Sequence, residues 1–205
     1  ADDDTEDIDQ TPSDEEVAKI IQTWRAIARG DWTAIEPQDM RGLNRIEGSM
    51  AIYGPVIELI AYTGLRSSEA RALRVKDIDL ASMELRVRRS MDDRNRAYET
   101  KTDAGRRTIP LPAAAEDVLR PRVDGRQGNE LLFATKNGTP LGYNNLYKRG
   151  WRNILKFAGL PRYGIHALRH YYASCLIAAG ADALEVKELV GHADITTTLN
   201  VYGHL

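Results

Sequence analysis

The chain lacks the features that mark secreted, disulfide-bonded or membrane-spanning proteins. It has one cysteine in 205 residues, Cys175, which excludes an internal disulfide and which we expect to be a plain core residue. No apolar run approaches the roughly 20 residues that a transmembrane helix needs, and no signal peptide is visible. Internal repeats and a Gly-rich phosphate loop are also missing. We therefore expect one sizeable domain in the cytoplasm, with no membrane partner.

Acidic residues are missing from a long internal stretch, and this is more informative than the net charge of −2. Residues 1–20 carry nine acidic groups and one lysine, which leaves 27 basic and 21 acidic groups, a net of +6, in residues 21–205. No Asp or Glu occurs between Glu130 and Asp182, an interval that contains seven basic residues. A solvated surface normally mixes both signs, so this interval favours a face directed at a polyanion.

The first residues differ in composition from the rest. Residues 1–12 are acidic and poor in apolar side chains, so we expect a disordered leader or a linker remnant, with the domain covering residues 13–205. Ser13 followed by Glu16 is a capping-box pattern that predicts a helix from there to about Ala28. Because no initiator methionine is present, we interpret the chain as a fragment.

Hydrophobic spacing predicts an α+β domain, mainly α-helical, with a small antiparallel sheet. Helices are expected over about 44–63, 69–73, 112–120 and 143–157, the second capped by Ser67 or Ser68. Residues 84–89 alternate as an edge strand would, residues 98–102 and 107–111 predict a hairpin, and 131–134 a short buried strand.

Four basic residues surround the apolar side of the predicted helix over residues 143–157. They are Lys148, Arg149, Arg152 and Lys156. Two interpretations stay open: a solvated flank, or a face that binds DNA phosphates.

Several residues that could take part in catalysis lie near the C-terminal end of the sequence. His166 and Arg169 lie three apart on a stretch with helical spacing, so we expect both side chains on one helix face. Gly180 ends that helix, Asp182 opens another, and a break at Gly191 and His192 precedes Tyr202. A guanidinium that grips phosphate oxygens, imidazoles that move protons and a phenol that attacks phosphorus suit a phosphodiester. None of these groups needs a metal, and we expect no cofactor.

Four short segments in this order resemble the boxes of the tyrosine recombinase family, the phage-integrase type of site-specific DNA recombinase. They are T-G-L-R-S-S-E at 63–69, H-A-L-R-H at 166–170, L-V-G-H at 189–192 and Tyr202. The resemblance implies a catalytic domain that cleaves and rejoins DNA strands through a 3′-phosphotyrosyl intermediate, without metal or ATP. It also implies double-stranded DNA as partner, a homotetramer of the full-length protein on DNA, and a nucleoid-associated prokaryotic, viral or mobile-element protein. From the family pattern we also expect that this chain lacks an N-terminal core-binding domain and a C-terminal tail.

The resemblance also implies roles for individual residues. Arg66 and Arg169 would clamp the phosphate, with Glu69 supporting Arg66. His166 would be a base or hydrogen-bond partner for the nucleophile Tyr202, and His192 a second donor to the phosphate. Lys101, expected before the turn of the predicted hairpin, would protonate the departing 5′ oxygen.

Three other functions compete with this interpretation. His166 and His170, with His192 or His204, could bind zinc in a metallohydrolase, but the segment lacks the glutamate of H-E-x-x-H. A DNA-binding module without catalysis would not need the full set of residues named above. A type IB topoisomerase would use similar chemistry, and plasmid relaxation compared with recombination between two sites would distinguish it.

Overall fold

The computed structural model describes residues 10–33, 43–100, 105–192 and 194–196. The helices are α1 Asp14–Ala28, α2 Leu43–Thr63, α3 Ser67–Ala72, α4 Glu116–Val123, α5 Tyr143–Asn145, the π-helix η4 Leu146–Trp151, α6 Arg152–Ala158, α7 Ala167–Ala178 and α8 Ala183–Val190. Short 3-10 turns are η1 Val75–Asp77 and η3 Ala113–Ala115. The strands are β1 Ile78–Asp79, β2 Glu84–Val87, β3 Arg89–Met91, β4 Ala97–Glu99 and β5 Arg107–Pro110. The predicted mainly helical α+β fold is confirmed.

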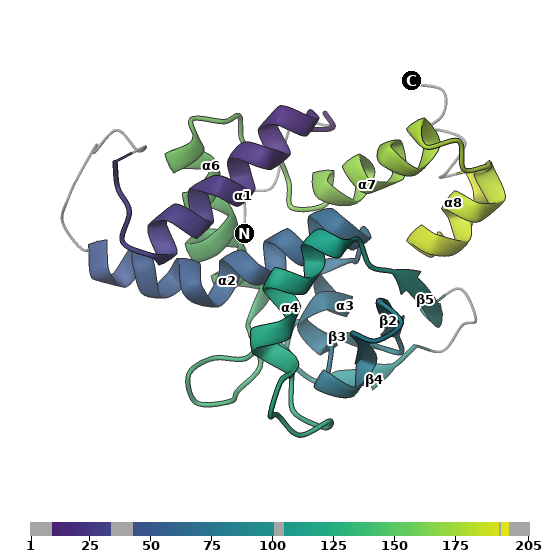
Figure 1. Cartoon of the computed structure of the whole chain (residues 1–205), viewed down its shortest axis with the longest axis horizontal. Helices are drawn as coiled ribbons and strands as arrows, with labels where there is room; N and C mark the ends of the chain where they lie inside the picture. Colours follow the sequence, from purple (N-terminus) through teal and green to yellow (C-terminus); the bar gives the residue numbers. More distant parts are fainter. Residues whose placement is uncertain (1–9, 34–42, 101–104, 193, 197–205) are drawn as a thin grey trace.

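Helix α2 lies at the centre and contacts α1, α3, α4, α7 and η4 (Figure 1). Every residue from 53 to 61 is buried, as expected of a helix that other elements surround on all sides. The charged exception is Glu58, whose carboxylate accepts hydrogen bonds from Arg25 Nε (3.0 Å) and Tyr62 Oη (3.0 Å). These partners compensate the cost of burying the charge.

The predicted helix starts at the two ends of the fold are confirmed. The Ser13 side chain accepts from the Glu16 amide and the Glu16 carboxylate accepts from the Ser13 amide, which opens α1. Asp182 and Glu185 do the same for α8, which ends at Gly191 with φ of 78°. The helix predicted over 44–63 matches α2, with Pro55 inside it.

The predicted serine cap of the third helix is wrong. Helix α3 begins at Ser67, so both serines lie within it and Arg66 is the residue that precedes the first turn. The Arg66 amide donates to Glu69 Oε2 (2.9 Å), which satisfies a free donor of that turn. The start of α3 therefore depends on a residue of the candidate site.

Two predictions for the strands are wrong. The strand order in the sheet is β1-β2-β5, all antiparallel, so β2 is the central strand and not an edge. Strand β4 pairs with β3 and not with β5, because Asp92 Oδ1 accepts from the amides of Arg94 and Arg96 and closes a local turn. The stretch predicted as strand 131–134 makes only isolated bridges.

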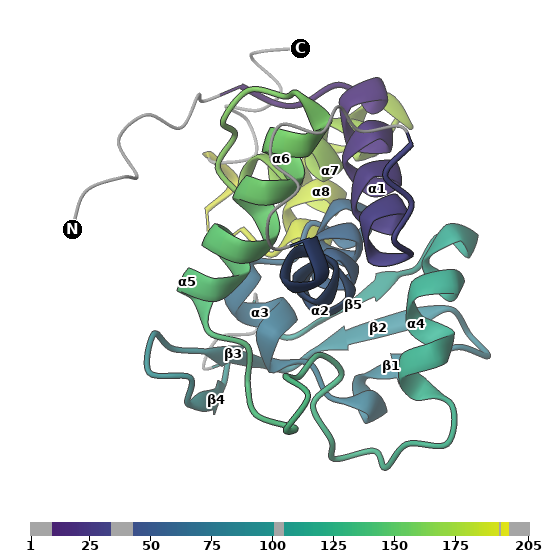
Figure 2. The same cartoon turned by 90° about the vertical axis from the view of Figure 1, so that its left-hand side faces the viewer.

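The second half of the chain returns to the helical layer. The helix predicted over 143–157 is present as α5, η4 and α6, with a π-helical middle. Gly150 allows η4 to lie close to α2, since a Cβ there would be 2.6 Å from Cβ of Tyr53. Figure 2 shows α1, α6, α7 and α8 gathered on one side, and the three-stranded sheet with α4 on the other. Among the described residues, no helix combines the length and apolar character needed to span a bilayer.

Candidate catalytic site

Arg66 links two parts of the site that are far apart in sequence. It lies two residues after Gly64, where α2 ends, and its side chain is 39% exposed. Its Nη1 donates to Glu69 Oε1 (3.1 Å), and its Nη2 donates to the carbonyl of Gly191 (3.0 Å), just after α8. The predicted pair of Arg66 and Glu69 is confirmed as an ion pair, and the second hydrogen bond fixes the turn before His192.

Glu69 is the buried anion beneath Arg66. Its side chain is 3% exposed, and it also accepts from Arg107 Nη1 (3.1 Å) and Nη2 (2.8 Å). Burial by itself would raise the pKa of Glu69, but the hydrogen bonds and positive charges of Arg107 and Arg66 outweigh it and lower the pKa. Glu69 is therefore an ionised carboxylate held between two guanidinium groups.

Arg169 is the second arginine and lies deeper than the first. It is 1% exposed, and its Nη1 donates to the carbonyl of Gly64 (2.8 Å). Its Nε and Nη2 have no hydrogen-bond partner within the described residues. Desolvation, followed by the charge of Arg66, lowers the pKa of Arg169 to about 9, which leaves it charged at pH 7. These two buried donors of a charged guanidinium lack acceptors, and the oxygens of an anion would accept hydrogen bonds from both.

The two predicted histidines lie at the same site but at different depths. His166 is the N-cap residue of α7 and is exposed, whereas Arg169 is buried. The two side chains predicted to lie on one helix face therefore differ in their exposure to solvent. His192 is buried in the turn after α8. Desolvation and then Arg169 lower the pKa of the buried His192 to about 4. The same two causes lower the pKa of His166, whose residue still reaches solvent on one side while its ring lies against the arginines of the site. At pH 7 each ring is neutral and offers one N–H donor and one acceptor nitrogen.

This arrangement suits the stabilisation of a pentacoordinate phosphate. Arg66 and Arg169 supply positive charge, and His166 and His192 supply neutral groups that donate or accept protons. The charges of Arg66 and Arg169 both act on His166 and His192, so the four side chains share one electrostatic environment. They come from the loop before α3, the start of α7 and the turn after α8.

Two predicted site residues, Lys101 and Tyr202, lie outside the described residues. Residues 194–196, which lie shortly before Tyr202 in the sequence, are described. There Asp194 Oδ1 accepts from the Thr196 amide (2.9 Å), an interaction typical of a helix N-cap.

The four basic residues predicted for DNA binding lie on η4 and α6. Lys148, Arg149 and Lys156 are exposed, and Arg152 is half-buried. A pocket of about 490 Å³ is lined by Lys148, Arg152 and Lys156 together with Arg162. Three of the four therefore face one recess, which is separate from the four residues of the candidate site.

Sequence reasoning missed Arg107. Its signal was present in the alternation of residues 107–110, where Arg107 shares a face with the buried Ile109. An arginine on the buried face of a strand needs an internal counter-charge, and here Glu69 supplies it. The pairing of a strand with α3 could not be inferred from spacing, since the two residues are 38 positions apart.

The described residues contain no group of three or more His, Cys, Asp or Glu side chains arranged to bind a metal ion. The rings of His166 and His170 meet edge to face, with centroids 5.1 Å apart. The nearest charges to His166 and His192 include two arginines, which would repel a cation.

Comparisons with known proteins find relatives that match most of the chain. A model of the phage integrase family matches residues 34–205. A tyrosine recombinase XerC-like protein of Caldanaerobacter subterraneus is 33% identical over 174 residues, 72% of this chain and 44% of that protein. Tyrosine recombinase XerH of Helicobacter pylori is 33% identical over 152 residues, 73% of this chain and 40% of that protein. The chain thus spans less than half the length of these two relatives.

Solved structures show the same fold. The Tn1549 transposon integrase, in complex with circular intermediate DNA, has a TM-score of 0.67 and 26% identity, with 100% of this chain and 66% of that one covered. The XerH recombinase bound to its difH substrate has a TM-score of 0.63 and 25% identity, covering 96% of this chain and 50% of that one.

Proposed function

Because the chain belongs to the phage integrase family of tyrosine recombinases, we propose that it acts as a site-specific recombinase that cleaves and rejoins DNA. The observation that carries the proposal is the buried Arg169, whose Nε and Nη2 have no partner among the described residues while Arg66 lies near it. Together they form an anion site that suits the scissile phosphate, without metal or ATP.

The proposed reaction starts with Tyr202. Its hydroxyl oxygen attacks phosphorus, its proton passes to His166, and the bond from phosphorus to the 5′ oxygen breaks. Lys101 protonates that oxygen, and His192 donates to the phosphate. The product is a 3′-phosphotyrosyl bond, which a 5′ hydroxyl can reverse to reseal the strand. Arg66 and Arg169 stabilise the charge that develops between these states, and Glu69 keeps Arg66 in place.

Double-stranded DNA is the proposed substrate, and Lys148, Arg149, Arg152 and Lys156 are proposed to bind its phosphates. Support comes from the absence of acidic residues between Glu130 and Asp182 and from the exposure of three of these four basic residues. We further propose that the full-length protein works as a tetramer on DNA, in the cytoplasm at the nucleoid. Residues 13–205 would form its catalytic domain and residues 1–12 a leader or linker.

A nicked suicide duplex tests the function. After cleavage, the short fragment beyond the nick diffuses away, so the covalent intermediate accumulates as a protease-sensitive protein–DNA adduct. We expect an adduct with the parent chain and none with Tyr202→Phe, which keeps DNA binding because only the attacking hydroxyl is removed. An adduct formed by the Phe variant would disprove the assignment of the nucleophile. Cleavage that EDTA abolishes would instead favour a metal-dependent reaction.

A further inference from the structure

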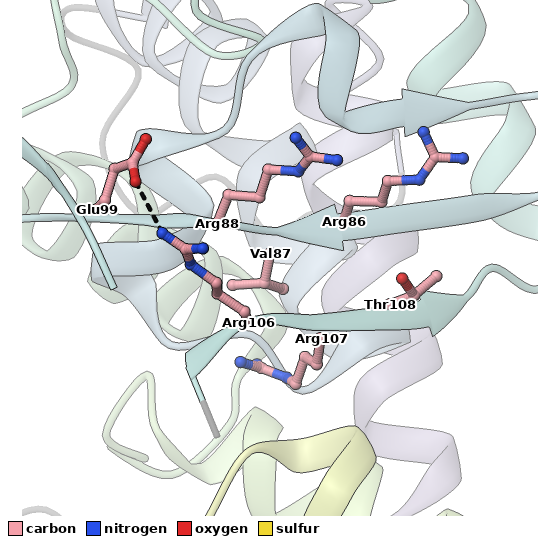
Figure 3. A pocket seen from close by; sticks show the side chains of 7 residues that line it. All are labelled: Arg86, Val87, Arg88, Glu99, Arg106, Arg107 and Thr108. Carbon is pink, nitrogen blue, oxygen red and sulfur yellow. Dashed lines mark hydrogen bonds and ion pairs between the residues drawn. The ribbon is translucent and has the colours of Figure 1, made fainter. Parts of the chain in front are cut away.

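Arg107 is an almost buried arginine on a strand whose neighbouring residues are exposed. Its side chain is 6% exposed, whereas that of Arg106 is 57% exposed and pairs with the exposed Glu99. Figure 3 shows Arg107 directed away from the side on which Arg86 and Arg88 project. The side chains drawn there line a pocket of about 480 Å³, and Arg107 is one of them. Its guanidinium nevertheless donates to Glu69, whose side chain is 3% exposed, so Arg107 is directed toward the candidate site.

The guanidinium of Arg107 joins three elements. Its Nη1 and Nη2 donate to the two carboxylate oxygens of Glu69 in α3 (3.1 and 2.8 Å), and its Nε donates to the carbonyl of Leu189 in α8 (2.8 Å). Arg107 itself is the first residue of β5. A bidentate ion pair this well buried fixes geometry as well as charge.

Each of these hydrogen bonds leads to a residue of the proposed reaction. The Glu69 carboxylate that accepts from Arg107 also accepts from Arg66, so the position of one guanidinium constrains the other. On the other side, Leu189 precedes the turn in which Gly191 accepts from Arg66 and His192 follows. A cavity of about 640 Å³ is lined by both Arg107 and His192.

We propose that Arg107 is a positioning residue for the phosphodiester reaction: through Glu69 it directs Arg66, and through Leu189 it holds the turn that presents His192. The inference rests on the proposed function, and it assigns Arg107 no contact with DNA. Lysine would replace it only in part, because an ammonium at the same place cannot donate in one plane to both oxygens of Glu69 and to Leu189.

Variants of two neighbouring arginines test the proposal. Arg107→Gln is expected to lower the rate of adduct formation on the suicide duplex by about tenfold or more, and Arg107→Lys by less, because the charge beside Glu69 remains. Arg106→Gln is the matched control, since it removes an exposed arginine from the next position, and should stay within about twofold of the parent. Parental rates with Arg107→Gln would overturn the inference.

A modified substrate separates positioning from a general loss of structure. A methylphosphonate at the scissile position replaces one charged oxygen by methyl, so the reaction needs less charge stabilisation from Arg66. The defect of Arg107→Gln relative to the parent should shrink by several-fold on at least one methylphosphonate diastereomer. An equal defect on phosphate and on both diastereomers would mean that Arg107 only supports the fold.

A second measurement does not depend on activity. The chain has four histidines, so the titration of the His192 ring can be followed by NMR and assigned by single substitutions. Release of the turn in Arg107→Gln should solvate His192 and move its pKa upward toward that of a free histidine, while Arg106→Gln leaves it unchanged. A parent chain that forms no adduct would reject the proposed function, whereas an unchanged His192 titration would reject the role of Arg107.

Discussion

Arg169 Nη1 donates to the carbonyl of Gly64 at 2.8 Å, so the second guanidinium of the site is anchored by the glycine that ends the central helix. Gly64 has φ of 61°, and the ring of Tyr172 lies where a Cβ would be, 2.4 Å from Cδ1. Position 64 therefore requires glycine for two reasons, its left-handed backbone and the lack of space for a Cβ. The carbonyl of the same residue also orients Arg169.

Gly64→Ala should lower the free energy of unfolding by about 2–4 kcal/mol, from backbone strain of roughly 1 kcal/mol and a clash in a packed core. Urea denaturation measures this change. Gly159→Ala is the matched control, because Gly159 has a similar φ of 63° but nothing within 4 Å of an added Cβ. If both variants lost the same stability, the clash with Tyr172 would contribute nothing.

Arg169→Lys should impair cleavage nearly as much as Arg169→Ala. The planar guanidinium of Arg169 donates to Gly64 through Nη1 and leaves Nε and Nη2 for the phosphate. Lysine would replace these oriented donors by a point charge. Loss of one preorganised donor costs about 2.7–4 kcal/mol in the transition state, roughly a hundredfold to a thousandfold in rate. Single-turnover cleavage of the suicide duplex gives the rates. A lysine variant faster than about a tenth of the parent would make Arg169 a general cation and not an oriented donor.

Stability should fall as the pH is lowered through the range set by His192. The pKa of His192 is about 4 in the folded chain, below its value of 6.5 as a free residue. Between these values the unfolded chain binds a proton that the folded chain does not, so acid favours unfolding. His192 should contribute a loss of about 2 kcal/mol between pH 7.5 and 5.

Urea denaturation at the two pH values measures this loss, with His192→Asn as the control. The variant should lose less stability than the parent over this range, and the difference between the two isolates the histidine from the carboxylates. Equal pH dependence in both proteins would show that His192 titrates normally.

Binding of DNA should depend on salt through the basic residues of η4 and α6. Replacing Lys148, Arg149, Arg152 and Lys156 by Gln should reduce the slope of log K against log salt by up to about 0.9 for each phosphate that is no longer neutralised. Fluorescence anisotropy across a salt series measures the slope. Arg120→Gln in α4 is the control, since that exposed arginine already pairs with Glu116. An unchanged slope in the fourfold variant would identify these residues as a solvated flank.

Local signals in the sequence predicted most of the helices and the members of the candidate site. Ser13 with Glu16, and Asp182 with Glu185, open helices because their side chains satisfy free amides of the same turn, an interaction that spans three residues. Arg66 and Glu69 are likewise close in sequence, so their ion pair could be predicted from spacing. The order of the family boxes identified the set that includes His166, Arg169 and His192 without any knowledge of distances.

Tertiary structure alone decided how strands pair and how the site is held together. Strand β5 pairs with β2, and β4 with β3, because partner choice depends on local turns and on shared burial that alternation does not reveal. Arg107 reaches Glu69 across 38 positions, and Arg66 reaches Gly191 across 125. Hydrogen bonds at such separations depend on how α2, α3, α8 and the sheet pack together, and that packing is set by the whole core and not by any one segment.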